Sequence, residues 1–141
     1  MKSAVPKPQR KTRTKPPCPF CRRIRRGQVV FENSLAVAIP DATPLSKGHT
    51  LILPRRHETE FFSLSKSEES DIWRAVRAIH ESLNTRLAPQ GYNIGINVGS
   101  VAGQTIGHVH VHLIPRYEGD VEDPRGGVRW IIPARAPYWK N

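Results

Sequence analysis

Three histidines occupy alternate positions in the carboxyl-terminal half of the chain: His108, His110 and His112. The residues between them are both valine, Val109 and Val111. Polar and apolar residues that alternate with a period of two are typical of a strand with one buried face, and valine favours that state. The sequence therefore predicts a strand that carries three imidazoles in a row on one surface.

The spacing of these imidazoles suits phosphate chemistry better than a single metal ion. Alternate side chains on a strand lie about 6.6 Å apart, whereas zinc binds nitrogen at about 2.0–2.1 Å. Two neighbouring histidines can share an ion, but three on a regular strand cannot. One neutral imidazole can instead attack phosphorus while its neighbours donate protons or hydrogen bonds. The alternative is a strand that merely presents histidine to solvent, and three histidines at this spacing weigh against it.

A second chemical motif lies near the amino terminus, where Cys18 and Cys21 form a C-x-x-C segment. A turn of this kind places two sulfurs within reach of one ion, but it supplies only half of a tetrahedral zinc site. Two reduced thiols without a metal, or a redox pair, are the alternatives. The chain has too few cysteines for a disulfide scaffold, so their close spacing indicates a reducing compartment or a metal.

The segments that must position these residues have the pattern of an α+β fold. Ser65 and Glu68 form a capping-box pattern at the start of a long helix with apolar residues at helical spacing, which ends near residues 89–91. In addition to the histidine strand, strands are predicted over 28–32, 35–39, 50–53 and 92–98. The sequence therefore predicts an antiparallel sheet of about five strands with one long helix.

The positive charge of the chain is concentrated at its amino end. Of the 141 residues, the first 26 contain ten Lys or Arg and no Asp or Glu, which equals the whole net charge of +10. We therefore expect two parts: a disordered basic tail over residues 1–17, and one domain over 18–141 with an irregular carboxyl-terminal extension. The tail either contacts nucleic acid, because a polybasic arm releases counterions from DNA, or remains solvated.

The apolar residues are too dispersed for a membrane protein. The sequence has no run of 18 apolar residues, so no membrane span is expected. An apolar stretch that could serve as a secretory signal is also absent near the amino end. The expected location is the cytoplasm.

The motifs above resemble those of a known family. The pattern His-φ-His-φ-His-φ-φ over residues 108–114, with φ an apolar residue, resembles the histidine triad (HIT) family of nucleotide hydrolases and transferases. The segment 48–57, with its Gly-His and Pro-x-x-His motifs, resembles the same family. The likeness covers about residues 18–118. It is greatest to the fragile-histidine-triad branch, whose members cleave dinucleoside polyphosphates.

The resemblance implies a role for each matching residue. His110 is the implied nucleophile, which forms a nucleotidyl-histidine intermediate. His108 and His112 orient it and stabilise charge on the phosphoryl oxygens, and His112 is also a candidate to protonate the leaving group. The implied substrate-binding residues are Asp41 for the ribose hydroxyls, Asn97 and Gln104 for sugar and phosphate, and His49 together with His112.

The resemblance also implies a metal and a quaternary structure. In HIT proteins with a C-x-x-C motif, a structural zinc is completed by two histidines, which correspond to His57 and His108. The implied zinc ligands are therefore Cys18, Cys21, His57 and His108. No organic cofactor is expected. HIT proteins commonly form homodimers with continuous sheets, so a homodimer is expected here.

The expected activity is hydrolysis at the α-phosphate of a dinucleoside polyphosphate such as diadenosine tetraphosphate. A nucleoside phosphoramidate hydrolase, a DNA-end deadenylase that uses the basic tail, and a nucleotide-binding module with slow turnover are the alternatives. The extension after residue 118 adds arginines that could meet a polyphosphate and tryptophans that could stack on a base, or these residues serve packing. They are Arg125, Arg129, Arg135, Trp130 and Trp139.

Overall fold

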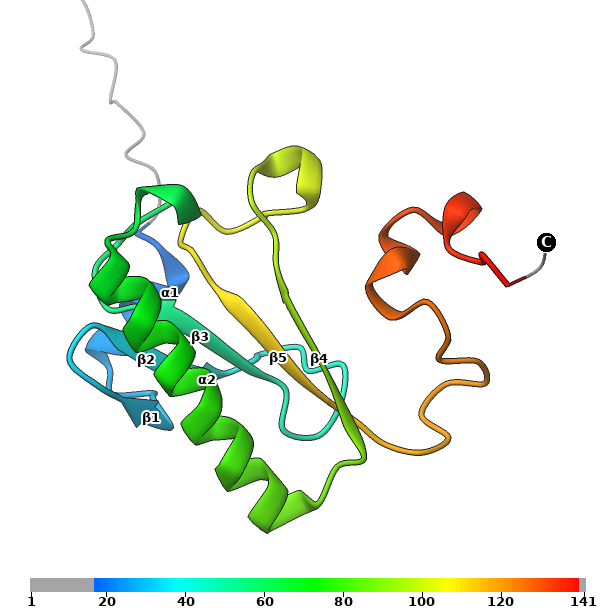
Figure 1. The fold of residues 1–141 in the computed structure, drawn as a ribbon. Helices are drawn as coiled ribbons and strands as arrows, with labels where there is room; N and C mark the ends of the chain where they lie inside the picture. The colour runs from blue at the N-terminus through cyan, green and yellow to red at the C-terminus, as the bar shows by residue number, and fades with distance from the viewer. Residues whose placement is uncertain (1–16, 140–141) are drawn as a thin grey trace, which may run out of the picture.

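A computed structural model describes residues 17–139, so the predicted disordered tail over 1–17 lies outside the described residues apart from its last position. The helices and strands are α1 (Pro19–Arg25), β1 (Phe31–Glu32), β2 (Ala36–Pro40), β3 (Thr50–Pro54), α2 (Lys66–Leu87), β4 (Gly91–Ile96) and β5 (Val111–Arg116). The strands form one antiparallel sheet in the order β1-β2-β3-β5-β4. Figure 1 shows this sheet with α2 lying across it. The predicted five-stranded antiparallel sheet with a long helix is confirmed.

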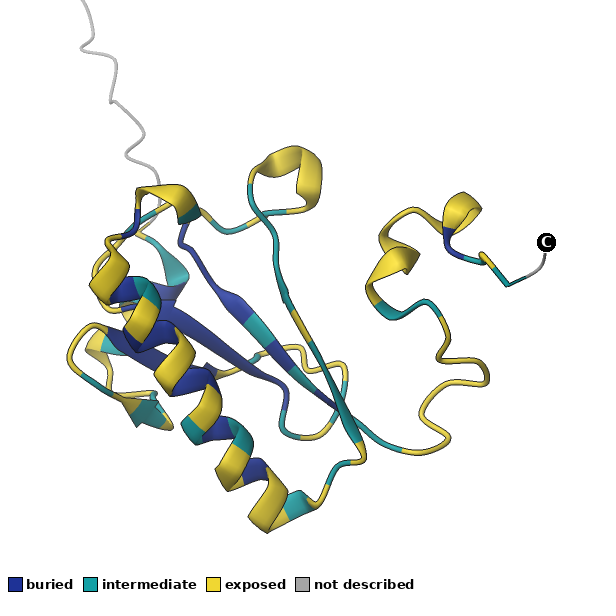
Figure 2. Cartoon of the chain, viewed as in Figure 1, coloured by how far each residue is buried: buried dark blue, intermediate teal, exposed yellow. Residues whose placement is uncertain are grey.

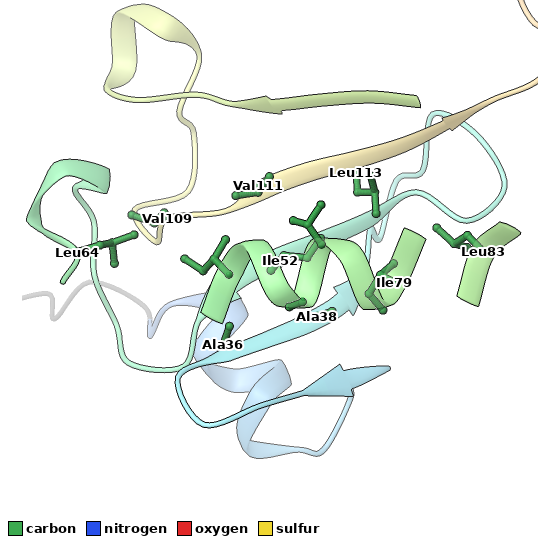
Figure 3. Close-up of a cluster of buried hydrophobic side chains, with 12 residues drawn as sticks. Ala36, Ala38, Ile52, Leu64, Ile79, Leu83, Val109, Val111 and Leu113 are labelled. Atoms are coloured by element: carbon green, nitrogen blue, oxygen red, sulfur yellow. The ribbon is translucent and has the colours of Figure 1, made fainter. Parts of the chain in front are cut away.

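Helix α2 covers one face of the sheet and forms the larger hydrophobic core. The capping box at Ser65 and Glu68 fixes its start, and Ala88 ends it in a left-handed conformation. Its buried side chains include Ile72, Ile79 and Leu83, which recur at helical spacing. Figure 3 shows Ile79 and Leu83 of this helix directed toward the strands. The strand residues in this core come from β2, β3 and β5 and include Ala38, Ile52, Val111 and Leu113.

The opposite face of the sheet carries a smaller core that fixes α1. Phe20 of α1 packs there with Val37 and Ile39 of β2 and with Leu51 and Leu53 of β3. Strands β2 and β3 are therefore apolar on both faces, which explains why each reads as a continuous apolar run rather than as an alternation. Figure 2 shows these two strands as the most deeply buried part of the sheet.

The histidine strand begins later than the sequence pattern predicts. Strand β5 starts at Val111, so His108 and His110 lie in the segment that enters it. The reason is a change of partner: the backbone N–H of Val109 donates to the carbonyl of Glu58 at 2.7 Å instead of continuing the ladder with β3. The strand continues through Pro115, because pairing with β3 ends at Leu113 and the missing N–H is tolerated there.

Three further segments differ from the sequence prediction, and one of them is β4, which ends at Ile96 instead of residue 98. The C-x-x-C segment was expected to be a turn, but it opens helix α1, with Pro19 in the first turn where its missing N–H costs little. Strand β1 has only two residues, Phe31–Glu32, instead of the five over 28–32.

The chain after β5 forms an irregular extension with the short 3₁₀ helices η3 (Gly127–Ile131) and η4 (Pro133–Arg135). Its arginines mainly hold the extension together. The guanidinium of Arg125 lies 4.6 Å above the ring of Trp139, and that of Arg129 lies 5.1 Å from the ring of Tyr138. Figure 1 shows this segment in orange and red beside β4. Over residues 17–139, none of the helices combines the length and apolar character that crossing a membrane requires.

Candidate active site and metal centre

A cavity of about 270 Å³ opens on the face of the sheet against which α1 packs. Two of the predicted histidines, His110 and His112, line it where the chain enters β5. The remaining lining comes from α1, from the loop after β2, from strand β3, and from the loop between β4 and β5. These residues are Phe20, Arg23, Asp41, Ala42, Thr43, Leu51, Asn97, Gly103, Thr105 and Ile106. The fold therefore brings residues from four distant segments around the second and third histidines.

His110 is held in one orientation by a backbone carbonyl. Its Nδ1 lies 2.8 Å from the carbonyl oxygen of His108, which can only accept, so Nδ1 carries the proton. In the neutral ring the lone pair is then on Nε2. The ring is buried, and Phe20 packs against it edge-on with the ring centroids 5.1 Å apart. The site thus offers an immobilised imidazole whose neutral form has its lone pair on Nε2, and a lone pair is what an attack on phosphorus requires.

His112 is part of a hydrogen-bond chain that begins at the backbone. The N–H of Leu45 donates to Nδ1 of His49 at 3.1 Å, so the proton of a neutral His49 is on Nε2. That Nε2 lies 3.0 Å from Nδ1 of His112 and 3.4 Å from Oδ2 of Asp41. His112 therefore accepts at Nδ1 and carries its own proton on Nε2. Asp41, His49 and His112 are close enough to share a cation, but hydrogen bonding already accounts for their spacing.

Burial keeps the rings of this chain neutral. Desolvation lowers the pKa of His49, and the nearby carboxylate of Asp41 offsets part of that effect. Desolvation is also the main reason that the pKa of His112 is lowered, with smaller contributions from His110 and His49. Both rings are therefore neutral at pH 7, which makes His112 a hydrogen-bond donor through Nε2 rather than a fixed positive charge.

Gly48 allows His49 to reach this position. Its φ of +92° lies in the left-handed region, and a Cβ there would stand 2.9 Å from Cδ2 of Leu83 and 3.0 Å from Cδ1 of Leu87. The chain therefore passes directly over the end of α2 before it enters β3. A residue with a side chain at position 48 would move the backbone and the His49 ring together.

The first histidine serves a different cluster, which fits a zinc ion. Nδ1 of His108 lies 3.6 Å from Sγ of Cys18 and 3.5 Å from Sγ of Cys21, and Nδ1 of His57 lies 3.3 Å from Sγ of Cys21. A tetrahedral zinc with bonds of about 2.3 Å to sulfur and 2.0–2.1 Å to nitrogen places these ligands about 3.6 Å apart. All four donor atoms lie within 4.8 Å of one another. The distances therefore match the predicted Cys18, Cys21, His57 and His108 site.

The surroundings of His108 support the same interpretation. Its Nε2 lies 2.9 Å from the carbonyl oxygen of Pro54, so Nε2 carries the proton and the Nδ1 lone pair is directed at the sulfurs. Burial lowers the pKa of His108 and raises the pKa of the Cys21 thiol, with Cys18 adding to the latter effect. Burial thus favours a neutral His108, which is the form that binds a metal.

The remaining predicted substrate contacts divide into two groups. Asp41 and Asn97 line the cavity. Gln104 does not, because its side chain holds the loop between β4 and β5: Oε1 accepts from the N–H of Gly99 at 2.9 Å, and Nε2 donates to the carbonyl of Thr59 at 2.9 Å. Asp41 also accepts from the N–H of Thr43 at 2.7 Å, which fixes the loop after β2.

Sequence reasoning missed the contribution of α1 to the cavity. Phe20 and Arg23 both line it, and Arg23 donates to the carbonyl of Pro40 at 2.8 Å. Their spacing of three residues, directly after Pro19, is the pattern of two side chains on one helix face. The sequence contains this helical spacing, but the C-x-x-C segment was interpreted as a turn.

Known proteins resemble this chain across most of its length. The family model of the HIT domain matches residues 23–119. An uncharacterized HIT-like protein of Methanocaldococcus jannaschii is 42% identical over 108 residues, which are 74% of this chain and 83% of that protein. A bis(5'-adenosyl)-triphosphatase of Dictyostelium discoideum is 33% identical over 71% of this chain and 67% of its own length. An adenosine 5'-monophosphoramidase of Schizosaccharomyces pombe is 34% identical, over 70% of this chain and 74% of that protein.

Solved structures resemble it as well. The crystal structure of a HIT family protein from Bacillus anthracis is 35% identical with a TM-score of 0.69, and the match covers 76% of this chain and 78% of that one. A zinc-bound histidine triad family protein from Mycobacterium smegmatis is 26% identical with a TM-score of 0.68, over 84% of this chain and 92% of that one. Because the family match spans well over half of the sequence, this chain belongs to the HIT family.

Proposed function

We propose that this HIT-family hydrolase cleaves dinucleoside polyphosphates at the α-phosphate, through a nucleotidyl intermediate on His110. The observation that carries the proposal is the bond from Nδ1 of His110 to the carbonyl of His108, which assigns the lone pair of the neutral form to Nε2 in a ring that lines the cavity. A relative named bis(5'-adenosyl)-triphosphatase supports the substrate class. Diadenosine tetraphosphate is the expected type of substrate.

The reaction proceeds in two displacements. Nε2 of His110 attacks the α-phosphorus, so that a nitrogen–phosphorus bond forms while the bond to the departing phosphate oxygen breaks. The proton on Nε2 of His112 moves to that oxygen. Water then attacks the phosphorus and returns a proton to His112, the nitrogen–phosphorus bond breaks, and the nucleoside monophosphate is released. Two displacements replace one difficult step, which is the purpose of covalent catalysis.

The other predicted residues bind the substrate or position these two histidines. Asp41 lines the cavity and would accept hydrogen bonds from the ribose hydroxyls, while Asn97 would donate to sugar or phosphate oxygens. His49 acts on the substrate through His112, whose Nδ1 it faces at 3.0 Å. Gln104 fixes the loop between β4 and β5 through its two hydrogen bonds to the backbone.

A structural zinc on the Cys18 cluster would tie α1 to the entrance of β5. When bound, such an ion supplies stability rather than chemistry on the substrate. One ligand is His108, whose carbonyl orients His110. Two others, Cys18 and Cys21, lie at the start of the helix that contributes Phe20 to the cavity. Thiols that bind zinc must stay reduced, which agrees with the cytoplasm as the proposed location.

A homodimer is also proposed. Strand β4 lies at the edge of the sheet, and Ile94 on this strand is 43% exposed. An edge strand with an apolar side chain is a template for pairing with a second copy. Sedimentation equilibrium of the full chain tests this, and a monomer at micromolar concentration would exclude it.

The experiment that tests the catalytic proposal measures AMP release from a panel of substrates: diadenosine tetraphosphate, diadenosine triphosphate, adenosine 5'-phosphoramidate and adenylated DNA. We expect His110→Ala to lower turnover by at least about a thousandfold, because nucleophile and general-base residues of a covalent mechanism act as a unit. The nucleotidyl enzyme, trapped by acid quench, should disappear while AMP still binds.

His80→Ala is the matched control. His80 lies on α2, where it contacts Asn84 and Tyr92, and it lines none of the cavities described for residues 17–139. That variant should keep wild-type turnover. The covalent mechanism through His110 would be wrong if His110→Ala retained a rate near that of the wild type. The phosphoramidase relative supports adenosine phosphoramidates as a second candidate substrate, and the panel separates the two classes.

A further inference from the structure

A hollow leads away from the catalytic cavity along the open face of β4 and β5. Its first part, of about 480 Å³, shares Asp41, Thr43, Asn97 and His112 with the catalytic cavity. Its second part, of about 500 Å³, shares five lining residues with the first, among them Asn93 and Ile114. The shared walls place the two parts in succession, and we call them together the trough. The trough begins at the His112 ring and ends against the carboxyl-terminal extension.

The far wall of the trough is made by the extension rather than by the HIT domain. Val128, Trp130 and Ile131 of η3 line it, and all three follow the end of the family match at residue 119. Gly127 brings this helix against the sheet, because a Cβ there would stand 3.3 Å from Nδ2 of Asn93. Trp130 is fixed by a bond from its Nε1 to the carbonyl of Arg125 at 2.8 Å. This wall is therefore a feature of this chain beyond the common domain.

The chemistry of the trough suits a flat, largely apolar group. Ile114 and the three η3 side chains supply apolar surface, with Val128 60% exposed and Ile131 83% exposed. The polar groups of the floor pair with one another: Arg116 donates to Asp120 at 2.7 Å and to Oδ1 of Asn93 at 2.6 Å. Arg116, the residue that would bind a phosphate, is already paired with Asp120. The base of a nucleoside, in contrast, can pack against the apolar wall and the indole of Trp130.

We infer that the trough holds the departing nucleoside of a dinucleoside polyphosphate, and that Trp130 and Ile131 determine the preference for substrates that have one. This inference rests on the function proposed above. The proton of His112 lies on Nε2, so the group that leaves is the group next to His112, and the trough starts at that ring. The nucleotide that stays on His110 occupies the smaller cavity beside α1. The two nucleosides thus lie on opposite sides of the scissile phosphate.

The test compares one substrate with a departing nucleoside and one without, in the full-length protein. We expect Ile131→Ser and Trp130→Ala each to lower the ratio of kcat/KM for diadenosine tetraphosphate to kcat/KM for adenosine 5'-phosphoramidate by about tenfold, as for loss of one base-stacking contact. Ile132→Ser is the matched control. Ile132 is adjacent and 56% exposed but lines none of the cavities described over residues 17–139, so its ratio should equal that of the wild type.

Each other outcome has a distinct meaning. An unchanged ratio in both trough variants would overturn the inference, whether or not both activities fell together. An equal fall of the ratio in Ile132→Ser would also overturn it, because the effect would then come from the extension as a whole. If the wild type released AMP from neither substrate, the proposed function itself would fail, and it would do so before any variant was compared.

Discussion

Each histidine of the site has one ring nitrogen turned to a fixed partner, and that partner determines the role of the other nitrogen. A carbonyl faces Nδ1 of His110 and leaves Nε2 with a lone pair. A carbonyl faces Nε2 of His108 and leaves Nδ1 for the cysteines. His49 faces Nδ1 of His112 and leaves a proton on Nε2. The backbone and one further histidine thus assign the tautomers of three residues of identical type, which supports their proposed roles as nucleophile, metal ligand and proton donor.

At the residue scale, the sequence predicted the candidate site residues but not the tautomers of their rings. The period of two predicted that the three histidines act together, and the resemblance implied a metal at His108, whereas only His110 and His112 line the cavity. Nothing in the sequence indicates which nitrogen of each ring carries the proton. The partners that decide it are backbone groups of Pro54, Leu45 and His108, and folding is what brings them next to the rings. The same holds for Gln104, whose two backbone partners lie at Gly99 and Thr59.

The buried ring of His49 should make stability depend on pH. Its folded-state pKa is lowered by desolvation, so between about pH 6.5 and that lower value the unfolded chain binds a proton that the folded chain does not. Stability is therefore fully present above about pH 6.5 and falls as the pH drops through this window. We expect His49→Gln to show a smaller loss of unfolding free energy than the wild type between about pH 7.5 and about pH 5.5 in urea titrations.

The same variant should also slow the enzyme, because His112 loses the partner that fixes its tautomer. A fall of kcat by roughly tenfold or more, with KM nearly unchanged, is the expected result, since positioned proton transfer contributes about a hundredfold to ten-thousandfold. His80→Gln, at a half-buried helix position remote from the cavity lining, is the control for both measurements. An identical pH dependence in His49→Gln and the wild type would contradict a neutral, buried His49.

At the scale of elements, the patterns that were predicted well are those set by local geometry. The capping box, the apolar spacing of α2 and the apolar runs of β2 and β3 depend on neighbours in sequence, and all appear in the structure. The start of β5 was predicted three residues too early. The chain leaves the ladder because the carbonyl of Glu58, 51 residues earlier in the sequence, accepts the hydrogen bond from the N–H of Val109. A long-range bond of this kind leaves no trace in local alternation.

Helix α1 is the element that depends most on a metal. It has seven residues, makes no side-chain cap, and buries a single side chain, Phe20. Short helices of this kind are marginal without tertiary support. Two of the four proposed zinc ligands, Cys18 and Cys21, lie at its amino end, while the other two come from the segments around β3 and β5. The ion would therefore join the helix to the sheet at the point where the cavity forms.

Replacing Cys18 by serine tests this. We expect the wild type to contain about one zinc per chain, and Cys18→Ser to lose it together with several kcal/mol of unfolding free energy, since structural zinc contributes about 10 kcal/mol in small peptides. Activity should fall as well, because Phe20 and Arg23 of the cavity belong to this helix. Metal analysis and thermal unfolding provide the measurements.

Arg22→Ser is the matched control, since it places serine at an exposed position of the same helix. It should retain zinc and melt near the wild-type temperature. A metal-free wild-type protein, isolated without chelator, would defeat the structural-zinc proposal. A Cys18→Ser variant that loses zinc but keeps full activity would show instead that the metal serves stability alone.

At the scale of the whole molecule, charge and chemistry are separated along the chain. All ten units of excess positive charge precede residue 27, and the remainder of the sequence carries as many acidic as basic residues. The catalytic cavity has Arg23 as its basic side chain among the residues that line it, and that guanidinium donates to the Pro40 carbonyl. Binding of a small nucleotide should therefore depend little on the positive charge of residues 1–26, whereas binding of a nucleic acid could involve all of these charges.

Deleting residues 2–17 separates these two possibilities. The deletion removes six positive charges and leaves Cys18, Cys21 and the three histidines in place. For a small-nucleotide hydrolase we expect kcat/KM on diadenosine tetraphosphate to change by no more than about threefold, because the deletion keeps every described residue that lines the cavity. For a DNA-end deadenylase, each lost phosphate contact would flatten the dependence of log affinity on log salt by about 0.9, and activity on adenylated DNA would fall with it. We expect the first result. A truncated enzyme with full activity on the dinucleotide but little on adenylated DNA would instead show that the amino-terminal charge belongs to the function and that DNA is the substrate, because the deletion leaves the three histidines and both cysteines in place.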